Sequence, residues 1–177
     1  MLKFLFYIFF ILNLRGLIFT SELPKELLGI NIGEKFYNLK KLFQLKSVKK
    51  ENFEKIYKVI YSSEETNFIE TYVSFFNSQV SKIKVLYNEN FIDENDWENI
   101  FNQAVSYYGV PNKVEIETQN DITTEFYLWE NENIKYEYLK ISKNDKILNF
   151  SIILRDKKIE QKILNLSPIK KFLYKIF

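Results

Sequence analysis

The sequence has 177 residues, with 25 Lys and Arg against 23 Asp and Glu, and contains neither His nor Cys. These absences exclude a Ser-His-Asp triad, a Cys nucleophile, disulfide bonds and zinc sites built on Cys or His. The length predicts one ordinary domain, and 17 Phe and 12 Tyr supply apolar surface for a core. We expect no catalytic residues, no metal and no cofactor.

Residues 1–21 resemble a secretory signal peptide or an N-terminal membrane anchor. A single cation, Lys3, precedes an apolar run from Phe4 to Leu12, and this order is typical of such leaders. The run alone is too short to cross a bilayer, which needs about 20 apolar residues. We expect a bacterial protein that is periplasmic or secreted, and membrane-anchored if the leader is retained. The alternative is a buried first element of a cytoplasmic domain.

The remaining chain is electrically neutral, because residues 22–177 carry 23 basic and 23 acidic side chains. Affinity for phosphates comes from net basic surface, so we expect no nucleic-acid partner. The charges are unevenly distributed. Residues 89–132 hold eleven acids and one base, whereas residues 155–177 hold seven bases and two acids.

The first half of the body, residues 29–88, predicts one helix followed by three strands. Apolar side chains recur three and four residues apart over residues 34–46, as in a half-buried helix. Segments rich in aromatic and β-branched residues then indicate strands. These strands are expected over residues 53–61, 67–76 and 80–87.

A second helix is expected over residues 94–108. Asp93 fits its N-cap, Gly109 fits the left-handed position after its last turn, and Pro111 prevents its continuation. Its apolar positions follow the spacing of an amphipathic helix. They are Trp97, Ile100, Phe101, Ala104, Val105 and Tyr108.

The start of this helix carries four acids within six residues. A calcium loop would need oxygen ligands at alternating positions and a central Gly, and no Gly lies nearby. Helix capping accounts for the acids without a metal. An acidic helix surface of this kind can also contact another protein, and Glu94 and Glu98 are its candidate contact residues. The four acids are Asp93, Glu94, Asp96 and Glu98.

Beyond the second helix, polar breaks at residues 131–133 and 143–145 are of the hairpin type and predict antiparallel neighbours. The strands are expected over residues 113–118, 124–129, 134–141 and 147–155.

These elements predict an α+β fold with an antiparallel sheet of about six to seven strands and two main helices packed on it. The expected single domain covers residues 22–166, with halves at residues 29–88 and 92–156. Each half reads as a helix followed by strands. A tandem α-β-β-β duplication is one interpretation of that order.

Two short segments, Gly29-Ile-Asn-Ile-Gly33 and Tyr108-Gly-Val-Pro111, are similar to segments of small periplasmic α+β proteins of the outer-membrane-assembly lipoprotein and β-lactamase-inhibitor-protein type. The resemblance implies helices paired with an antiparallel sheet, sometimes in tandem, and a role in binding other proteins. This chain departs from the pattern because it has no Cys for lipidation. Its first helix also lacks a closing Gly-x-Pro.

Aromatic residues on two neighbouring predicted strands form a second candidate contact surface. Stacked aromatic side chains on one face of a sheet can bind a partner, but they also pair across strands in ordinary cores, and core packing is the favoured interpretation. If exposed, they would be a binding platform. The residues are Tyr127, Trp129, Tyr136 and Tyr138.

Four glutamates on predicted strands support an alternative function. A pair of carboxyl groups across a cleft is the requirement of glycoside hydrolysis, and Glu115 and Glu117 share one face of their strand. Alternatively, they form the polar face of a sheet, with Val114 and Ile116 toward the core. The four are Glu115, Glu117, Glu125 and Glu130.

The C-terminal tail, residues 167–177, is basic and amphipathic. It fits docking on the body of the protein or contact with a membrane interface. Taken together, the sequence predicts a non-enzymatic extracytoplasmic protein that binds another envelope protein. The alternatives are a carboxylate-dependent glycan hydrolase and a membrane-attached module that uses both termini.

Overall fold

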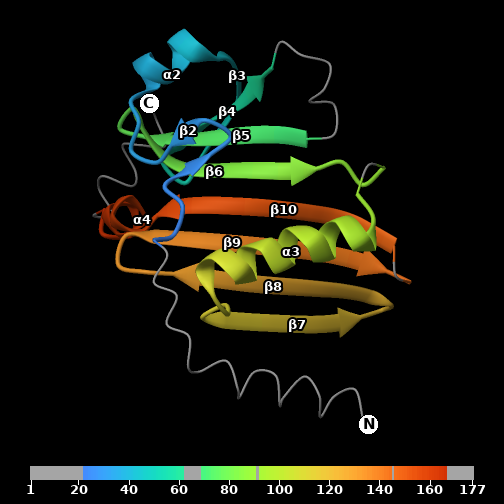
Figure 1. Ribbon diagram of the computed structural model, residues 1–177. Helices are drawn as coiled ribbons and strands as arrows, with labels where there is room; N and C mark the ends of the chain where they lie inside the picture. The colour runs from blue at the N-terminus through green and yellow to red at the C-terminus, as the bar shows by residue number, and fades with distance from the viewer. Residues whose placement is uncertain (1–21, 62–68, 91, 145, 167–177) are drawn as a thin grey trace.

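The computed structural model contains one eight-stranded antiparallel sheet with helices on both of its faces (Figure 1). The strand order is β3-β4-β5-β6-β10-β9-β8-β7, so two four-stranded meanders join through their last strands, β6 and β10. The expected leader at residues 1–21 and the tail at residues 167–177 lie outside the described residues. The structure describes residues 22–61, 69–90, 92–144 and 146–166.

The N-terminal meander follows a two-stranded hairpin, β1 (Glu26–Leu27) and β2 (Ile30–Asn31), and a short helix, α2 (Phe36–Leu42). The three strands predicted for this half are confirmed with small shifts in their bounds. The four strands of the N-terminal meander are β3 (Gln44–Glu51), β4 (Glu54–Ile60), β5 (Ile69–Phe76) and β6 (Gln79–Tyr87).

The helix expected over residues 34–46 is shorter in the structure. Phe43 continues the apolar spacing, but its backbone is extended (φ −131°, ψ 146°) and the chain enters β3 one residue later. β3 is an edge strand in which only Leu45 is not fully exposed. An edge strand of this kind needs little apolar alternation, and the sequence therefore gave no strand signal there.

The C-terminal half begins with α3 (Glu94–Tyr108), whose bounds are those predicted. Asp93 accepts a hydrogen bond from the Asp96 backbone N–H at 2.9 Å, and the Asp96 side chain accepts one from the Asp93 N–H at 3.1 Å. Gly109 closes the helix at φ 76°, a conformation that costs little only for glycine. The predicted N-cap is confirmed, and Gly109 ends the helix as predicted, although its ψ of −166° lies outside the left-handed helical region.

Four strands and a final helix complete this half. Because β3 is added to the strands expected from the sequence, the main sheet has eight strands where six to seven were expected, and β1 and β2 form a separate two-stranded sheet. The final helix follows β10 without a break, with Asp156 as its N-cap, and the sequence did not predict it. The elements are β7 (Lys113–Gln119), β8 (Ile122–Glu130), β9 (Ile134–Lys143), β10 (Lys146–Asp156) and α4 (Lys157–Leu164).

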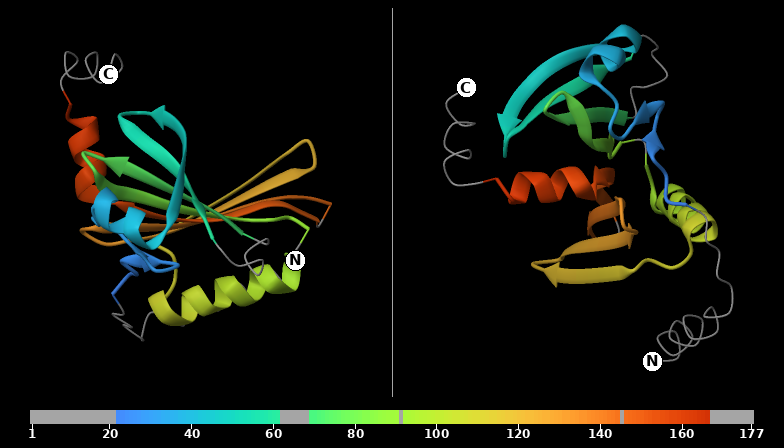
Figure 2. Two further views of the ribbon diagram at one scale, coloured as in Figure 1. Left: turned by 90° about the horizontal axis from the view of Figure 1, so that it is seen from above. Right: turned by 90° about the vertical axis from the view of Figure 1, so that its left-hand side faces the viewer.

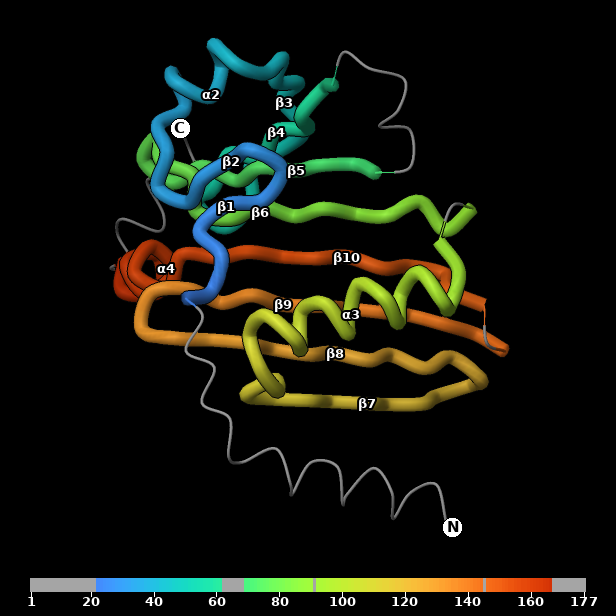
Figure 3. The backbone as a smooth tube through the Cα atoms, viewed as in Figure 1, coloured from blue at the N-terminus to red at the C-terminus, as the bar shows by residue number. Residues whose placement is uncertain are grey.

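The core lies between the sheet and α2, α3 and the β1–β2 hairpin. α3 runs across β8, β9 and β10 (Figure 3). Its Trp97 is buried in the core cluster. Its ring centroid is 5.1 Å from that of Phe150 and 5.7 Å from that of Tyr127. In the other half, Phe36 of α2 packs against Phe75 at 5.1 Å. Edge-to-face and tilted ring pairs of this kind stabilise a core beyond their buried area.

No helix in the described part of the chain is both long and apolar enough to cross a membrane.

Candidate functional site

The sheet face opposite α2 and α3 is the strongest candidate for a binding surface; it is called the open face below. Of the described helices only α4 lies on this side of the sheet, at one end. The outer strands of the sheet bend toward this same side (Figure 2). Successive side chains of a strand alternate between faces, so the pairing register assigns each residue to a face. The charged open-face residues around the centre of the sheet and in β4 and β5 include Glu54, Lys58, Glu70, Lys82, Lys84, Lys135, Glu137 and Arg155.

Three cations stand directly opposite one another across β6, β10 and β9. Lys82 pairs with Arg155 in the register, and Arg155 pairs with Lys135. Like charges in this position destabilise a sheet unless anions compensate them. Each has one acidic partner. The Lys82–Glu54 distance is 3.6 Å, the Arg155–Glu137 distance is 2.8 Å and the Lys135–Glu160 distance is 2.7 Å.

Arg155 and Glu137 form an ion pair by distance but not a hydrogen bond. The Arg155 Nε–H group has no acceptor in hydrogen-bond geometry among the described residues. A buried donor without an acceptor costs free energy. The guanidinium is therefore held beside Glu137 but is not fully satisfied.

Lys84 is the fourth cation of this group. It stands opposite Tyr72 on one side and Ile153 on the other. Burial lowers the pKa of Lys84, and the nearby charges of Lys82 and Arg155 lower it further. Within the described residues Lys84 has no ion pair or hydrogen bond. An external carboxylate would supply the anion that this half-buried ammonium group lacks.

A second ion pair borders Lys84. Lys58 contacts Glu70 at 2.5 Å, and the Tyr72 hydroxyl donates to the same carboxylate at 2.5 Å. The hydrogen bonds from Lys58 and Tyr72 hold the pKa of Glu70 below its usual value. The same bond raises the pKa of Tyr72 to about 12. Glu70 is therefore committed to these two partners and leaves Lys84 uncompensated.

A pocket of about 290 Å³ opens at the end of the open face where α4 lies. Its walls combine side chains of both charges with apolar side chains. The lining residues from strands and turns are Asn52, Phe53, Glu54, Ser81, Lys82, Arg155 and Asp156, and α4 adds Glu160, Ile163 and Leu164.

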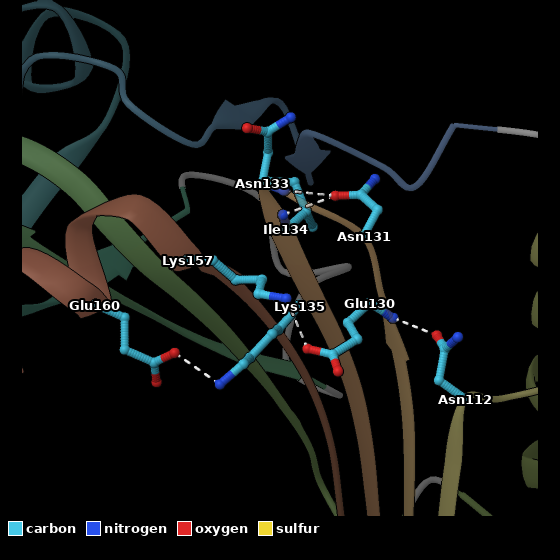
Figure 4. Close-up of polar contacts among 8 residues, drawn as sticks. All are labelled: Asn112, Glu130, Asn131, Asn133, Ile134, Lys135, Lys157 and Glu160. Atoms are coloured by element: carbon cyan, nitrogen blue, oxygen red, sulfur yellow. Dashed lines mark hydrogen bonds and ion pairs between the residues drawn. The ribbon is translucent and has the colours of Figure 1, made fainter.

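Polar contacts fix α4 against the β8–β9 hairpin (Figure 4). Lys157 contacts Glu130 at 2.9 Å, and Glu160 of α4 contacts Lys135 at 2.7 Å. The Asn131 side chain accepts from the backbone N–H groups of Asn133 and Ile134, both at 2.9 Å. The wall of the pocket is thus tied to the C-terminal meander and does not depend on the apolar contact of α4 alone.

The predicted contact residues of α3 lie on the other side of the sheet. Glu94 contacts Lys140 at 2.6 Å, and Glu125 contacts the same ammonium group at 2.8 Å. Burial lowers the pKa of Lys140, but the hydrogen bonds and charges of Glu125 and Glu94 outweigh it and raise the pKa overall. Glu94 thus fastens the helix to the sheet, while Glu98 is exposed on its outer side.

The four aromatic residues considered as a platform are packed beneath α3. Trp129, Tyr136 and Tyr138 are buried, and Tyr127 is half-buried with its ring centroid 4.6 Å from that of Phe101. Trp129 donates its indole N–H to the Gly109 carbonyl at 2.8 Å. This placement corresponds to the core-packing alternative.

The glutamates of the hydrolase alternative do not converge. Glu125 faces α3, whereas Glu115, Glu117 and Glu130 face the opposite side of the sheet. Glu115 and Glu130 are each paired with a lysine, and the hydrogen bond from Lys157 holds the pKa of Glu130 below its usual value. Among the described residues no group of three or more acidic side chains could hold a metal ion.

Sequence reasoning did not select the open face. Alternating polar side chains were visible in Glu70 and Tyr72 of one strand and in Lys82 and Lys84 of the next. They indicate one polar face on each strand. The arrangement of three cations directly opposite one another, however, appears only when β6 is paired with β10, and these two strands are far apart in the sequence.

No family model matches the sequence, and no curated protein matches it. Among solved structures, a cysteine-rich secretory protein from Staphylococcus aureus aligns at 13% identity and a TM-score of 0.43 over 77% of this chain. The chain spans about half of that protein, 48% of its length. A DUF4309 family protein from Bacillus subtilis aligns at 15% identity and a TM-score of 0.42, covering 83% of this chain and 95% of its own. At these TM-scores neither assigns a function.

Proposed function

We propose that this chain is a non-enzymatic, extracytoplasmic protein whose open face binds an acidic segment of another envelope protein. The observation that supports it most is Lys84, a half-buried cation between Tyr72 and Ile153 without an anionic partner in the described residues. A carboxylate of a partner would complete its pairing, and the adjacent pocket offers room for neighbouring side chains.

The location in this proposal depends on the leader alone. The Lys3-then-apolar order of residues 1–21 favours export, with anchoring if the leader is retained. The tandem interpretation is also part of the proposal. In each half a helix precedes a four-stranded meander, which extends the α-β-β-β order expected from the sequence by one strand.

Site-specific photo-cross-linking tests the surface. A photoreactive amino acid is placed at Tyr72 or Leu139 on the open face, and at the exposed Asn102 of α3 as a matched control. We expect adducts with one envelope protein from the open-face positions alone, and their loss in the Lys84→Met variant. Adducts of equal yield from Asn102, or adducts unaffected by Lys84→Met, would contradict the proposed surface.

Cell fractionation with sequencing of the mature N-terminus tests the location. We expect the protein outside the cytoplasm, with a new N-terminus near residue 21 or with residues 1–21 retained in the membrane. An intact chain in the cytosol would contradict the proposed compartment and leave the binding surface to be judged by the cross-links.

A further inference from the structure

No described strand pairs with the outer edge of β7. All seven residues of β7 are exposed, and within residues 22–61, 69–90, 92–144 and 146–166 the strand pairs with β8 alone, in one regular register from Lys113 to Gln119. Every second residue of an edge strand directs its backbone N–H and C=O away from the sheet, where they can pair with another strand. No Pro or Gly interrupts this edge, since Pro111 lies before it.

The opposite edge of the sheet, β3, is protected. Its register shifts between Ser47 and Lys49, and such a bulge twists an edge away from further pairing. It also carries Lys46, Lys49 and Lys50, a common means of preventing edge-to-edge association. β7 has neither a bulge nor more than one lysine.

Two apolar side chains of β7 are exposed on the side of the sheet that faces α3. Val114 is 49% exposed and Ile116 is 62% exposed. The sequence placed both toward the core. The structure differs because α3 covers β8 to β10 and does not reach the outermost strand (Figure 3). Val110, just before β7 in the chain, is also exposed. Ile122 is exposed too, but the pairing register places it on the opposite side of the sheet.

The other side of β7 is acidic. Glu115 contacts Lys113 at 2.6 Å, whereas Glu117 has no ion pair within the described residues. The surrounding stretch, residues 89–132, holds eleven acids and one base. A strand added here with cations opposite the glutamates and apolar residues opposite Val114 and Ile116 would satisfy both sides, because residues directly opposite share a face.

We propose that the β7 edge binds an extended segment of another protein in which Lys or Arg alternates with apolar residues, and that this segment pairs as a ninth strand of the sheet. A second copy of β7 fits less well. Antiparallel self-pairing about Ile116 places Glu115 opposite Glu117 twice, which is destabilising. Self-pairing about Glu115 places two Glu115 side chains opposite each other but sets Lys113 opposite Glu117, so a dimer in this register is one of the outcomes that the test below separates. This surface is separate from the open face, so either proposal can fail alone.

The test uses the protein and a fluorescein-labelled octapeptide in which lysine alternates with valine. At low salt we expect a Kd on the order of 100 µM, because the interface is small, and weaker binding as salt is added. The same peptide with a central proline should not bind. Hydrogen exchange on the wild type should show peptide-dependent protection confined to residues 113–119 and the edge residues beside them.

The paired variant Glu115→Lys with Glu117→Lys should weaken peptide binding about tenfold, since it replaces opposite-charge pairs with like-charge pairs. Glu22→Lys with Glu26→Lys makes the same change in net charge at exposed positions elsewhere and should leave the Kd unchanged. Both variants alter exposed residues, so folding is retained.

Three results would overturn the proposal. The first is the absence of peptide binding or of protection in β7. The second is equal weakening by both variants, which would mean attraction to net charge without a strand site. The third is a dimer that Ile116→Lys dissociates, which would assign this edge to a second copy of the chain.

Discussion

The two halves of the sheet have the same order of elements but cover their inner faces differently. In the N-terminal half, α2 has seven residues and its N-cap, Lys35, makes no side-chain hydrogen bond. In the C-terminal half, α3 has fifteen residues and a capping box between Asp93 and Asp96. The β1–β2 hairpin supplements α2, and its Ile30 is fully buried.

This difference shows where the stability of the fold is concentrated. α3 joins the sheet through an aromatic cluster around Trp97 and through Lys140, which contacts one glutamate of the helix and one of β8. α2 has the apolar contacts of Leu39 and Phe36 without a comparable buried ion pair. We therefore expect the C-terminal half to resist local opening more strongly.

The largest effect is expected from removing the central side chain beneath each helix. Trp97→Ala should lower the free energy of unfolding by about 4 kcal/mol, and Leu39→Ala by about 3 kcal/mol, because both leave cavities in closed cores. Urea denaturation measures both. Glu98→Ala, on the exposed side of α3, is the control and should change stability by less than about 0.5 kcal/mol. A Leu39→Ala effect clearly above that of Trp97→Ala would reverse the comparison.

The next effect concerns the buried cation of the C-terminal half. Lys140→Met should cost about 2 to 3 kcal/mol, because it leaves the largely buried Glu125 without its counterion. Lys58→Met is the matched control in the N-terminal half. Its partner Glu70 is more exposed than Glu125, 42% against 16% of the side chain, so a cost below about 1 kcal/mol is expected. Each carboxylate keeps one tyrosine hydrogen bond, from Tyr72 and from Tyr127, so this contact does not separate the two variants.

Urea denaturation at neutral pH measures the loss of unfolding free energy in both lysine variants. Equal losses would show that the ion pairs of Lys140 do not stabilise the C-terminal half more than Lys58 stabilises the N-terminal half. Adding Glu125→Gln to Lys140→Met should recover part of the loss, since the uncompensated charge is removed with its partner. No recovery would mean that packing of the lysine stem, and not its charge, caused the effect.

Alkaline pH tests the buried tyrosines beneath α3. Burial raises the pKa of Tyr138 to about 12 and raises that of Tyr136 further. Unfolding lowers the pKa of each to about 10, so the unfolded state releases protons first and stability falls as pH rises between 10 and 12. Between pH 8 and pH 11 the free energy of unfolding of Tyr138→Phe should therefore fall by about 1.4 kcal/mol less than that of the wild type.

Urea denaturation at the two pH values provides the measurement, and Tyr37→Phe on the exposed side of α2 is the control. If Tyr138→Phe and the wild type lose the same stability, the hydroxyl group of Tyr138 is not protected from deprotonation in the folded state.

The same contrast explains how much of the fold the sequence predicted. α3 was predicted to the residue because Asp93, Gly109 and the apolar spacing all indicate one helix. α2 was extended too far because Phe43 fits a helical spacing while its neighbours form an edge strand with few apolar residues. α4 was missed because Asp156 both ends β10 and caps the helix, leaving no polar break.

The candidate sites were harder to predict for a physical reason. Trp129 and Tyr138 were recognised as important aromatic residues, but their burial depends on which strands α3 crosses. The uncompensated Lys84 depends on the partners of its neighbours across two strands. Local patterns give the face of a residue within its own strand, whereas the charge balance of a sheet face is set by long-range pairing.

The smallest effects come from exchanging the capping chemistry of the two helices. Asp93→Ala should cost about 1 kcal/mol, because it removes the side-chain acceptor for the Asp96 N–H. Lys35→Asp supplies an acceptor at the N-cap of α2, whose backbone is already extended (φ −79°, ψ 139°), and should stabilise by about 0.5 kcal/mol. Both changes lie on exposed side chains and are measured by thermal and urea unfolding. Lys35→Gln, which removes the charge without adding a good cap, separates the two contributions. A Lys35→Asp variant no more stable than Lys35→Gln would show that the weakness of α2 lies in its length, since about two turns give a cap little helix to stabilise.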